Sequence, residues 1–314
     1  MRLTAWLALG AALGVAAWVV HVVRRRADRT PVGRRFFAYR PAGLGMFVLT
    51  SAVLLSLAAP LVAPTPPAAQ LDIVALQNKP PSFAHPLGTD LYSRDVWSRL
   101  VYGTRVSLAV GALAMLVAIG LGALVGATAG YAGGAVDGVL MRLVDVGLSV
   151  PRIFLLLVLV GLWERMPLAA LVLAIGGTSW FGTSRLVRAE VLSLRERDFV
   201  TAARALGGGA PRVIFRHVLP NAAAPLLVSA ALGVGGVLLL EAGLSFLGIG
   251  VAPPRPSWGN MIADARDHVR AAPWSVVFPG LAIAGVVMAC NAVGDGLRDA
   301  FDPRRDATTL EERP

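Results

Sequence analysis

The side chains able to do catalytic chemistry are few in this chain and lie far apart. The one lysine, Lys79, follows an asparagine, so the Gly-Lys-Ser/Thr sequence of a P-loop is absent and ATP cannot bind in that manner. The four histidines form no His-Glu-x-x-His motif, and no Gly-x-Ser-x-Gly nucleophile elbow occurs. The single cysteine, Cys290, excludes a disulfide framework. We therefore expect no catalytic residue, no metal site and no cofactor on this chain.

One acidic residue stands inside a long apolar stretch. Glu241 follows the uncharged run 218–240, and an acid in such a run is costly and usually faces a cavity or a polar partner. With Ser245, one helical turn later, it is a candidate for lining a translocation path. The alternative places Glu241 at the outer interface, capping the irregular stretch around Gly248 and Gly250.

A second group of charges lies in the segment 82–95, where Asp90 and Asp95 bracket Arg94. Proline and glycine turn signals in this segment indicate an ordered loop. These three residues predict either a docking surface for a soluble partner, or an outer gate, or a lid whose charges pair internally. The alternatives stay open at this point.

Two further patterns concern packing. Arg142 and Asp145 stand three residues apart, so a helix would bring them together as an ion pair. Gly122, Gly126 and Gly130 recur every four residues, which permits close approach of a second helix. We expect that helix to belong to this chain; the alternative is a helix of a partner.

The most informative stretch is the Arg-rich loop 185–220. The stretch Arg195–Leu206 is predicted to form one amphipathic helix, with an apolar face made by Phe199, Val200, Ala203 and Leu206. The glycines 207–209 should stop it, and Pro211 suits the first turn of a second helix that ends by residues 219–220. Two helices separated by a glycine break predict that this loop is a compact projection that docks on a partner. The alternative is that the loop is a solvated linker.

The elements that position these residues are membrane spans. Of the 314 residues, 56% are hydrophobic and 15% charged, and the mean hydropathy is +0.66. A spanning helix needs about 20 apolar residues, and seven stretches qualify: 3–23, 43–63, 106–131, 143–163, 166–184, 220–250 and 271–294. The fold class is therefore all-α, a polytopic membrane helical bundle. The net charge of +10 reflects arginines on the cytoplasmic side and does not indicate nucleic acid.

Orientation follows from the basic residues. With 24–40 inside and alternating spans, 19 Lys and Arg lie inside and nine outside. This places the C-terminus in the cytoplasm and the N-terminus outside. Because three arginines follow the first apolar stretch and only Arg2 precedes it, we expect a retained anchor; a cleaved signal peptide or a misassigned start is the alternative.

Several separated motifs carry a resemblance to a known family. The spacing Thr201-Ala202-Ala203-x3-Gly207-x11-Leu219-Pro220 resembles the EAA signature of permease subunits of binding-protein-dependent ABC importers. Further motifs resemble the dipeptide/oligopeptide/nickel group, and its second permease subunit above all: residues 85–90, 94–95, 102–103, 142–145, 241–248, 256–260, 294–299 and 302–304. The resemblance covers about residues 43–305. Thr201 stands where the family signature has an acidic residue, and His217 where the pattern has an aliphatic one.

The resemblance implies a six-span permease domain, 43–305, with an extracytoplasmic loop 64–104 and a coupling loop 185–220. Residues 1–42 would add an N-terminal span and basic linker, and 306–314 a cytoplasmic tail. In this family the coupling loop docks on the ATPase subunit. The residues expected to do so here are Thr201, Ala202, Ala203, Leu206, Gly207, Arg212, Arg216, Leu219 and Pro220.

The implied partners are a second permease subunit in a heterodimer, two ATPase subunits that carry ATP and Mg, an extracytoplasmic substrate-binding protein and the lipid bilayer. Peptide import across the cytoplasmic (inner) membrane is the expected function, with a nickel chelate as the alternative cargo. A self-sufficient channel or secondary transporter is the rival from another class. It would need ionisable residues or broken helices at the midplane, whereas the charges here cluster near the ends of the spans.

Overall fold

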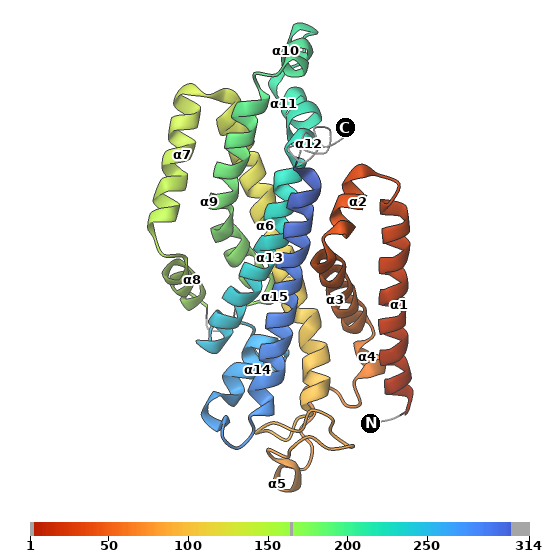
Figure 1. Ribbon diagram of the computed structural model, residues 1–314. Helices are drawn as coiled ribbons and strands as arrows, with labels where there is room; N and C mark the ends of the chain where they lie inside the picture. The colour runs from red at the N-terminus through yellow and green to blue at the C-terminus, as the bar shows by residue number, and fades with distance from the viewer. Residues whose placement is uncertain (1–2, 164–165, 303–314) are drawn as a thin grey trace.

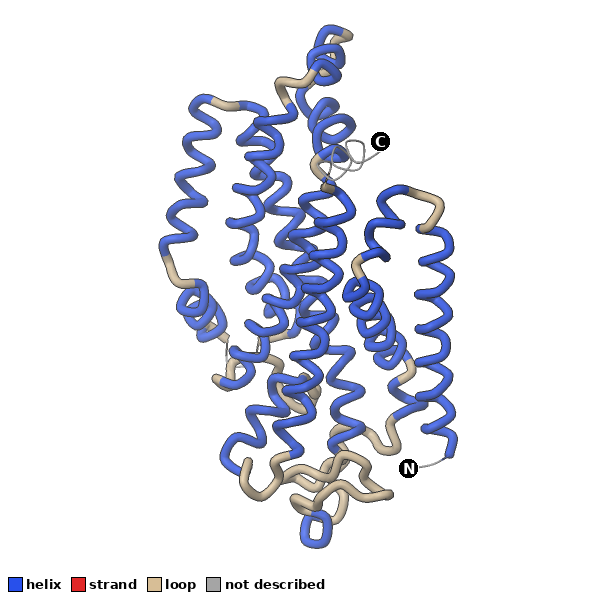
Figure 2. The backbone as a smooth tube through the Cα atoms, in the orientation of Figure 1, coloured by secondary structure: helices blue, strands red, loops and turns tan. Residues whose placement is uncertain are grey.

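The computed structural model describes residues 3–163 and 166–302. The predicted tail 306–314 lies outside these residues. In the described part the secondary structure is helical, apart from one isolated bridge between Thr89 and Asp95 (Figure 2). The all-α prediction is confirmed.

Five helices are long and apolar enough to cross a membrane: α1 (Leu3–Ala27), α3 (Arg40–Leu57), α6 (Val96–Ala132), α13 (Ala223–Phe246) and α15 (Trp274–Phe301). A sixth long helix, α9 (Leu168–Leu194), packs along α6. It is less apolar than the five because Thr178, Ser179, Thr183 and Ser184 lie in its middle.

The predicted span 143–163 is wrong as a single straight helix. The structure has α7 (Gly134–Ser149) followed by α8 (Arg152–Gly161), bent by 84° at the break. Pro151 causes the break, because proline cannot donate the helical hydrogen bond and forces the residue before it towards extended backbone. Val150 accordingly has φ −91° and ψ 124°.

Short helices occupy the two ends of the bundle. At the end where α10 projects they are α2 (Pro31–Ala38), α10 (Asp198–Ala205), α11 (Ala210–Val213), a π-helical turn over Ile214–Val218, and α12 (Leu219–Asn221). At the other end they are α4 (Ala59–Val62), α5 (Ile73–Leu76), α14 (Trp258–Ala265) and a 3₁₀ turn over Arg266–His268. We call α10–α12 (198–221) the knob, and its end of the bundle the knob end; the opposite end, with residues 77–95, is the loop end (Figure 1).

The most extensive packing in the bundle joins α6 to α9. A Cβ atom at Gly126 would lie 2.3 Å from the carbonyl oxygen of Ser184, and one at Gly122 would lie 2.6 Å from the side chain of Thr183. The glycine stripe therefore packs within this chain, as we expected. Only glycine allows the two backbones to approach this closely.

The first helix, α1, lies at the side of the bundle against α3 and α4. It begins at the loop end and finishes beside α2 at the knob end, as Figure 1 shows. Small residues form its inner face, with Ala5, Ala12 and Ala16 buried, whereas Trp6 and Trp18 are exposed. The last described helix, α15, finishes at the knob end (Figure 1). The two ends of the described chain therefore lie at opposite ends of the bundle.

Candidate functional site

The knob is held together by a small valine cluster. Val200 of α10 and Val213 of α11 are fully buried and pack with Val191 of α9 and with Val218. This cluster fixes the knob to the end of α9, while α10 projects beyond the other helices (Figure 1). The loop 185–220 is thus an ordered element and not a solvated linker.

The prediction that the glycines 207–209 end the first helix of the loop is confirmed. Gly207 adopts φ +82°, the left-handed region that glycine enters at little cost. Its N–H donates to the carbonyl of Arg204 at 2.9 Å, and the N–H of Gly208 donates to the carbonyl of Ala203 at 3.0 Å. These two bonds form a Schellman motif that satisfies the last carbonyls of α10. Pro211 lies in the first turn of α11, as predicted.

Three details of the predicted loop are wrong. The helix begins at Asp198 and not at Arg195, because α9 continues to Leu194 and a turn separates the two helices. Leu206 does not share the inward face of Val200 and Ala203; it is 89% exposed, because it is the residue at which the chain leaves the helix. The second helical stretch continues past Pro220 to Asn221.

Most of the predicted docking residues lie on the surface of the knob. Leu219 and Ala203 are partly buried, and the exposed ones are Thr201, Ala202, Leu206, Gly207, Arg212, Arg216 and Pro220. A Cβ at Gly207 would meet open space. Phe215, which is 60% exposed, was not among the residues expected to dock. An aromatic residue between Arg212 and Arg216 was the available signal.

Arginines of the knob and of the end of α9 bind the ends of α6 and α7. The Arg204 guanidinium lies 4.7 Å from the centre of the Tyr131 ring, and its Nε donates to the Tyr131 hydroxyl at 3.1 Å. Arg195 donates to the carbonyl of Gly130, and Arg188 forms a bidentate pair with Asp137 at 2.5 and 2.6 Å. Arg204 thus joins the knob to α6, while Arg195 and Arg188 join the turn before the knob and the end of α9 to α6 and α7.

The predicted pair of Arg142 with Asp145 is wrong. Asp145 accepts a hydrogen bond from Arg185 of α9 instead, so the pair joins two helices. Spacing along one helix could not reveal this, because the partner lies 40 residues away.

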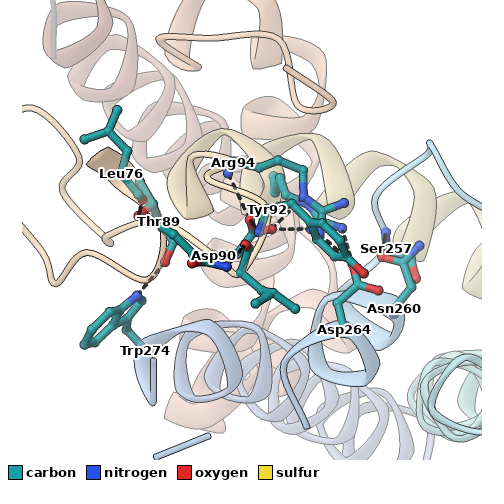
Figure 3. A network of polar contacts seen from close by, with 12 residues as sticks. Leu76, Thr89, Asp90, Tyr92, Arg94, Ser257, Asn260, Asp264 and Trp274 are labelled. Atoms are coloured by element: carbon teal, nitrogen blue, oxygen red, sulfur yellow. Dashed lines mark hydrogen bonds and ion pairs between the residues drawn. The ribbon is translucent and has the colours of Figure 1, made fainter. Parts of the chain in front are cut away.

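At the loop end, the charges of the segment 82–95 are paired internally (Figure 3). Asp90 is buried and accepts from the backbone N–H groups of Tyr92 and Arg94, from Arg94 Nε at 2.7 Å and from Arg99 Nη1 at 2.6 Å. Both arginines also donate to Asp264 of α14, at 2.7 and 3.1 Å. Two carboxylates and two guanidinium groups thus join the loop, α6 and α14.

Further contacts close the same loop. Asp95 caps the N-terminus of α6 through Ser98 N–H and pairs with His85 at 2.9 Å. The indole N–H of Trp274 donates to the carbonyl of Thr89 at 3.0 Å. This geometry corresponds to the lid alternative, because Asp90, Arg94 and Asp95 have their charges satisfied within the chain.

Glu241 is 1% exposed and bonds to hydroxyl groups, not to a cation. Oε1 accepts from Ser245 Oγ at 2.7 Å and from Ser257 Oγ at 2.9 Å, and Ser245 Oγ accepts from the Val251 N–H. Glu241 therefore ties the end of α13 to the irregular stretch 247–257, the arrangement of the outer-cap alternative. Ser245 lines a cavity of about 470 Å³ at this end, together with Gly248, Val160 and Asp264 among others.

An open apolar groove of about 740 Å³ lies nearer the knob end. Side chains of α9, α13 and α15 line it, including Leu186, Leu232 and Phe301. In the described part of the chain, no three His, Cys, Asp or Glu side chains gather closely enough to hold a metal ion.

Comparisons with known proteins agree with this architecture. Residues 100–307 match the family model of the binding-protein-dependent transport system inner membrane component, and residues 32–81 match the N-terminal TM domain of oligopeptide transport permease C. The chain is 42% identical to a dipeptide transport system permease protein of Alkalihalophilus pseudofirmus over 262 residues, which are 83% of this chain and 85% of the relative.

Two further relatives have similar coverage. A putative peptide permease protein of Brucella suis is 42% identical over 290 residues, 89% of this chain and 93% of the relative. A dipeptide transport system permease protein of Haemophilus influenzae is 39% identical over 287 residues, 88% and 96% of the two chains.

Proposed function

Since this chain belongs to the family of binding-protein-dependent transport system inner membrane components, we propose that it is the permease subunit of a peptide importer, a multi-pass protein of the inner membrane. The relatives named for dipeptide and peptide transport support peptide as the cargo. Because permeases of this family work with ATPase subunits and a binding protein, we propose both as partners of this chain.

The knob is the proposed dock for an ATPase subunit. It projects from one end of the bundle, its fold is fixed by buried valines, and it exposes Leu206 and Phe215 beside Arg212 and Arg216. Exposed apolar side chains on a rigid projection are what a groove in a soluble partner binds. The exposure of Leu206 is the observation that carries this assignment. In our proposal ATP and Mg bind to the ATPase subunits, and this chain hydrolyses nothing.

The proposed second permease chain packs against the apolar surface that this chain leaves open. The groove lined by Leu186, Leu232 and Phe301 offers such a surface, and so do the exposed side chains of α7 and α8, among them Val139 and Val158. Two permease chains, each with one knob, would engage the two ATPase subunits. When ATP closes the ATPase dimer, the knobs would move with it and shift the bundle between inward-facing and outward-facing packings.

In the proposed orientation the knob end and the C-terminus are cytoplasmic, and the N-terminus and the loop end face outside. The knob end carries the basic residues at the end of α1, Arg24, Arg25 and Arg26, as the positive-inside rule requires. The binding protein would meet the loop end, where the ion-paired lid presents an ordered surface.

Replacing Leu206 tests the dock. Leu206→Glu puts a charge where the partner groove expects an apolar side chain, and burying an unpaired charge is costly. We expect the variant to insert and fold normally and to lose at least tenfold in ATPase association, measured by co-purification. The matched control is Val74→Glu, an equal change at a side chain 95% exposed at the loop end. Unchanged co-purification of Leu206→Glu would refute the dock.

A further inference from the structure

Arg152 is a partly buried cation to which the proposed transport cycle gives no role. It begins α8, directly after the break at Pro151. Its Nη2 donates to the hydroxyl of Ser179 on α9, while its Nε is buried and has no hydrogen-bond partner. No Asp or Glu among residues 3–163 and 166–302 forms an ion pair with it.

The contacts of Arg152 leave its positive charge unpaired and its Nε–H without an acceptor. A cation within a span is costly, and such residues usually pair with an acid or face a polar pathway. The Ser179 hydroxyl also donates to the Ile175 carbonyl, so it offers Arg152 one neutral acceptor and no charge. A buried N–H without an acceptor costs further free energy. An anion that binds at Arg152 would supply both the missing charge and the missing acceptor.

The position of Arg152 at a helix break supports a binding role. It lies at the break of a span that is bent by 84°, and transport sites recur at such breaks. The neighbouring part of α9 carries the hydroxyl side chains Thr178 and Ser179 next to Gly176 and Gly177. From Arg152, α8 runs roughly 14 Å to Gly161 at a rise of about 1.5 Å per residue. Gly161 lines the cavity at the loop end.

We propose that Arg152 binds the terminal carboxylate of the peptide during its passage through the bundle. The inference rests on the proposed function, because the carboxylate is that of the imported peptide. A guanidinium group suits this task, since it holds a carboxylate through two parallel charge-assisted hydrogen bonds. The ligand class is therefore a peptide with a free C-terminus, and an amidated peptide would lack the group that Arg152 binds.

The test uses the assembled importer with the probes Ala-Ala and Ala-Ala amide. In a Cys290→Ala background, Leu155→Cys places a thiol one helical turn from Arg152. We expect Ala-Ala to slow maleimide labelling of this thiol about tenfold, and the amide to have no effect. Arg152→Gln should abolish the protection and reduce ATP-driven import of Ala-Ala about tenfold. Arg152→Lys should retain part of both, and Arg142→Gln, an exposed arginine of α7, should retain both fully.

The outcomes separate the possible errors. If the unaltered importer takes up Ala-Ala and Arg152→Gln changes neither protection nor import, the inference is wrong and the proposed function stands. If Arg152→Gln no longer assembles with the second permease while Arg152→Lys does, Arg152 pairs with an acid of that subunit and the inference is again wrong. If the unaltered importer takes up no peptide, the proposed function itself fails.

Discussion

At the scale of single residues, the buried acids Asp90 and Glu241 are satisfied by partners within the chain. Asp90 receives two guanidinium contacts and two backbone N–H groups, and Glu241 receives two serine hydroxyls. Such buried groups are costly to separate from their partners. They therefore hold the loop end in one conformation, whereas the exposed Leu206 and Phe215 at the knob end remain available to a partner.

Arg94 distinguishes a packed lid from a docking surface. Arg94→Glu removes a cation from two carboxylates and adds a third acid beside them. Breaking a largely buried pair costs about 3 kcal/mol, so we expect the melting temperature of the purified complex to fall by about 5–10 °C. Thermal denaturation measures this shift.

The control for this prediction is Lys79→Glu, the same change of charge at an exposed residue of the same loop. It should leave the melting temperature unaltered. A docking surface would give the opposite pattern. Arg94→Glu would then melt like the unaltered protein and bind the binding protein more weakly, with a steep dependence on salt.

At the scale of elements, the contact between α6 and α9 supports the knob. The glycine stripe brings α6 close to α9, and the arginines at the end of α9 bind Asp137 and Gly130 at the ends of α7 and α6. The knob therefore stands on a rigid pair of helices. The connection between α7 and α8 lacks this continuous helical support, because Pro151 interrupts the helix.

Gly126 tests the importance of the close contact. Gly126→Ala would place a methyl group 2.3 Å from the carbonyl oxygen of Ser184, so the helices must separate. We expect a loss of about 2 kcal/mol or more in stability, seen as a lower yield of monodisperse protein and a lower melting temperature. Gly120→Ala is the matched control on the same helix, because a Cβ there meets nothing within 4 Å. Equal behaviour of the two variants would contradict this account of the contact.

The elements also show what the sequence can predict. Apolar stretches between charges predict the long helices, because lipid demands internally satisfied backbones. The glycines after Leu206 and the proline at 211 predict the knob, because their backbone preferences act locally. The break at Pro151 was missed because the apolar stretch 143–163 is long enough to span as one helix, and the proline inside it was not treated as a break. The partner of Arg94 on α14 could not be predicted, since Asp264 lies 170 residues away and only the folded bundle brings them together.

At the scale of the whole molecule, the bundle has two functional ends. The knob end carries the proposed dock, and the loop end carries the lid, the Glu241 contacts and the cavity beside Ser245. The family models match from residue 32 onwards, so α1 lies outside them and packs at the side of the bundle. Movement of the knob would reach the loop end along α6, which extends from Val96 to Ala132.

The proposed orientation has a direct test. In a Cys290→Ala background, single cysteines at Asp28 and Arg212 lie at the knob end, and one at Ser82 lies at the loop end; all three positions are exposed. We expect a membrane-impermeant maleimide to label position 82 in intact cells, and positions 28 and 212 only after the membrane is opened. Labelling of position 28 or 212 from outside would overturn the orientation.

The central claim is that this chain forms one half of an ATP-driven peptide permease whose knob receives the motion of the ATPase. Uptake of labelled Ala-Ala into proteoliposomes tests it most directly, with both permease chains, the ATPase subunits and the loaded binding protein present. We predict uptake that requires ATP, stops when the ATPase subunits are omitted, and falls at least tenfold with Leu206→Glu. Uptake that continues without the ATPase subunits would contradict the account and identify the chain as a self-sufficient transporter.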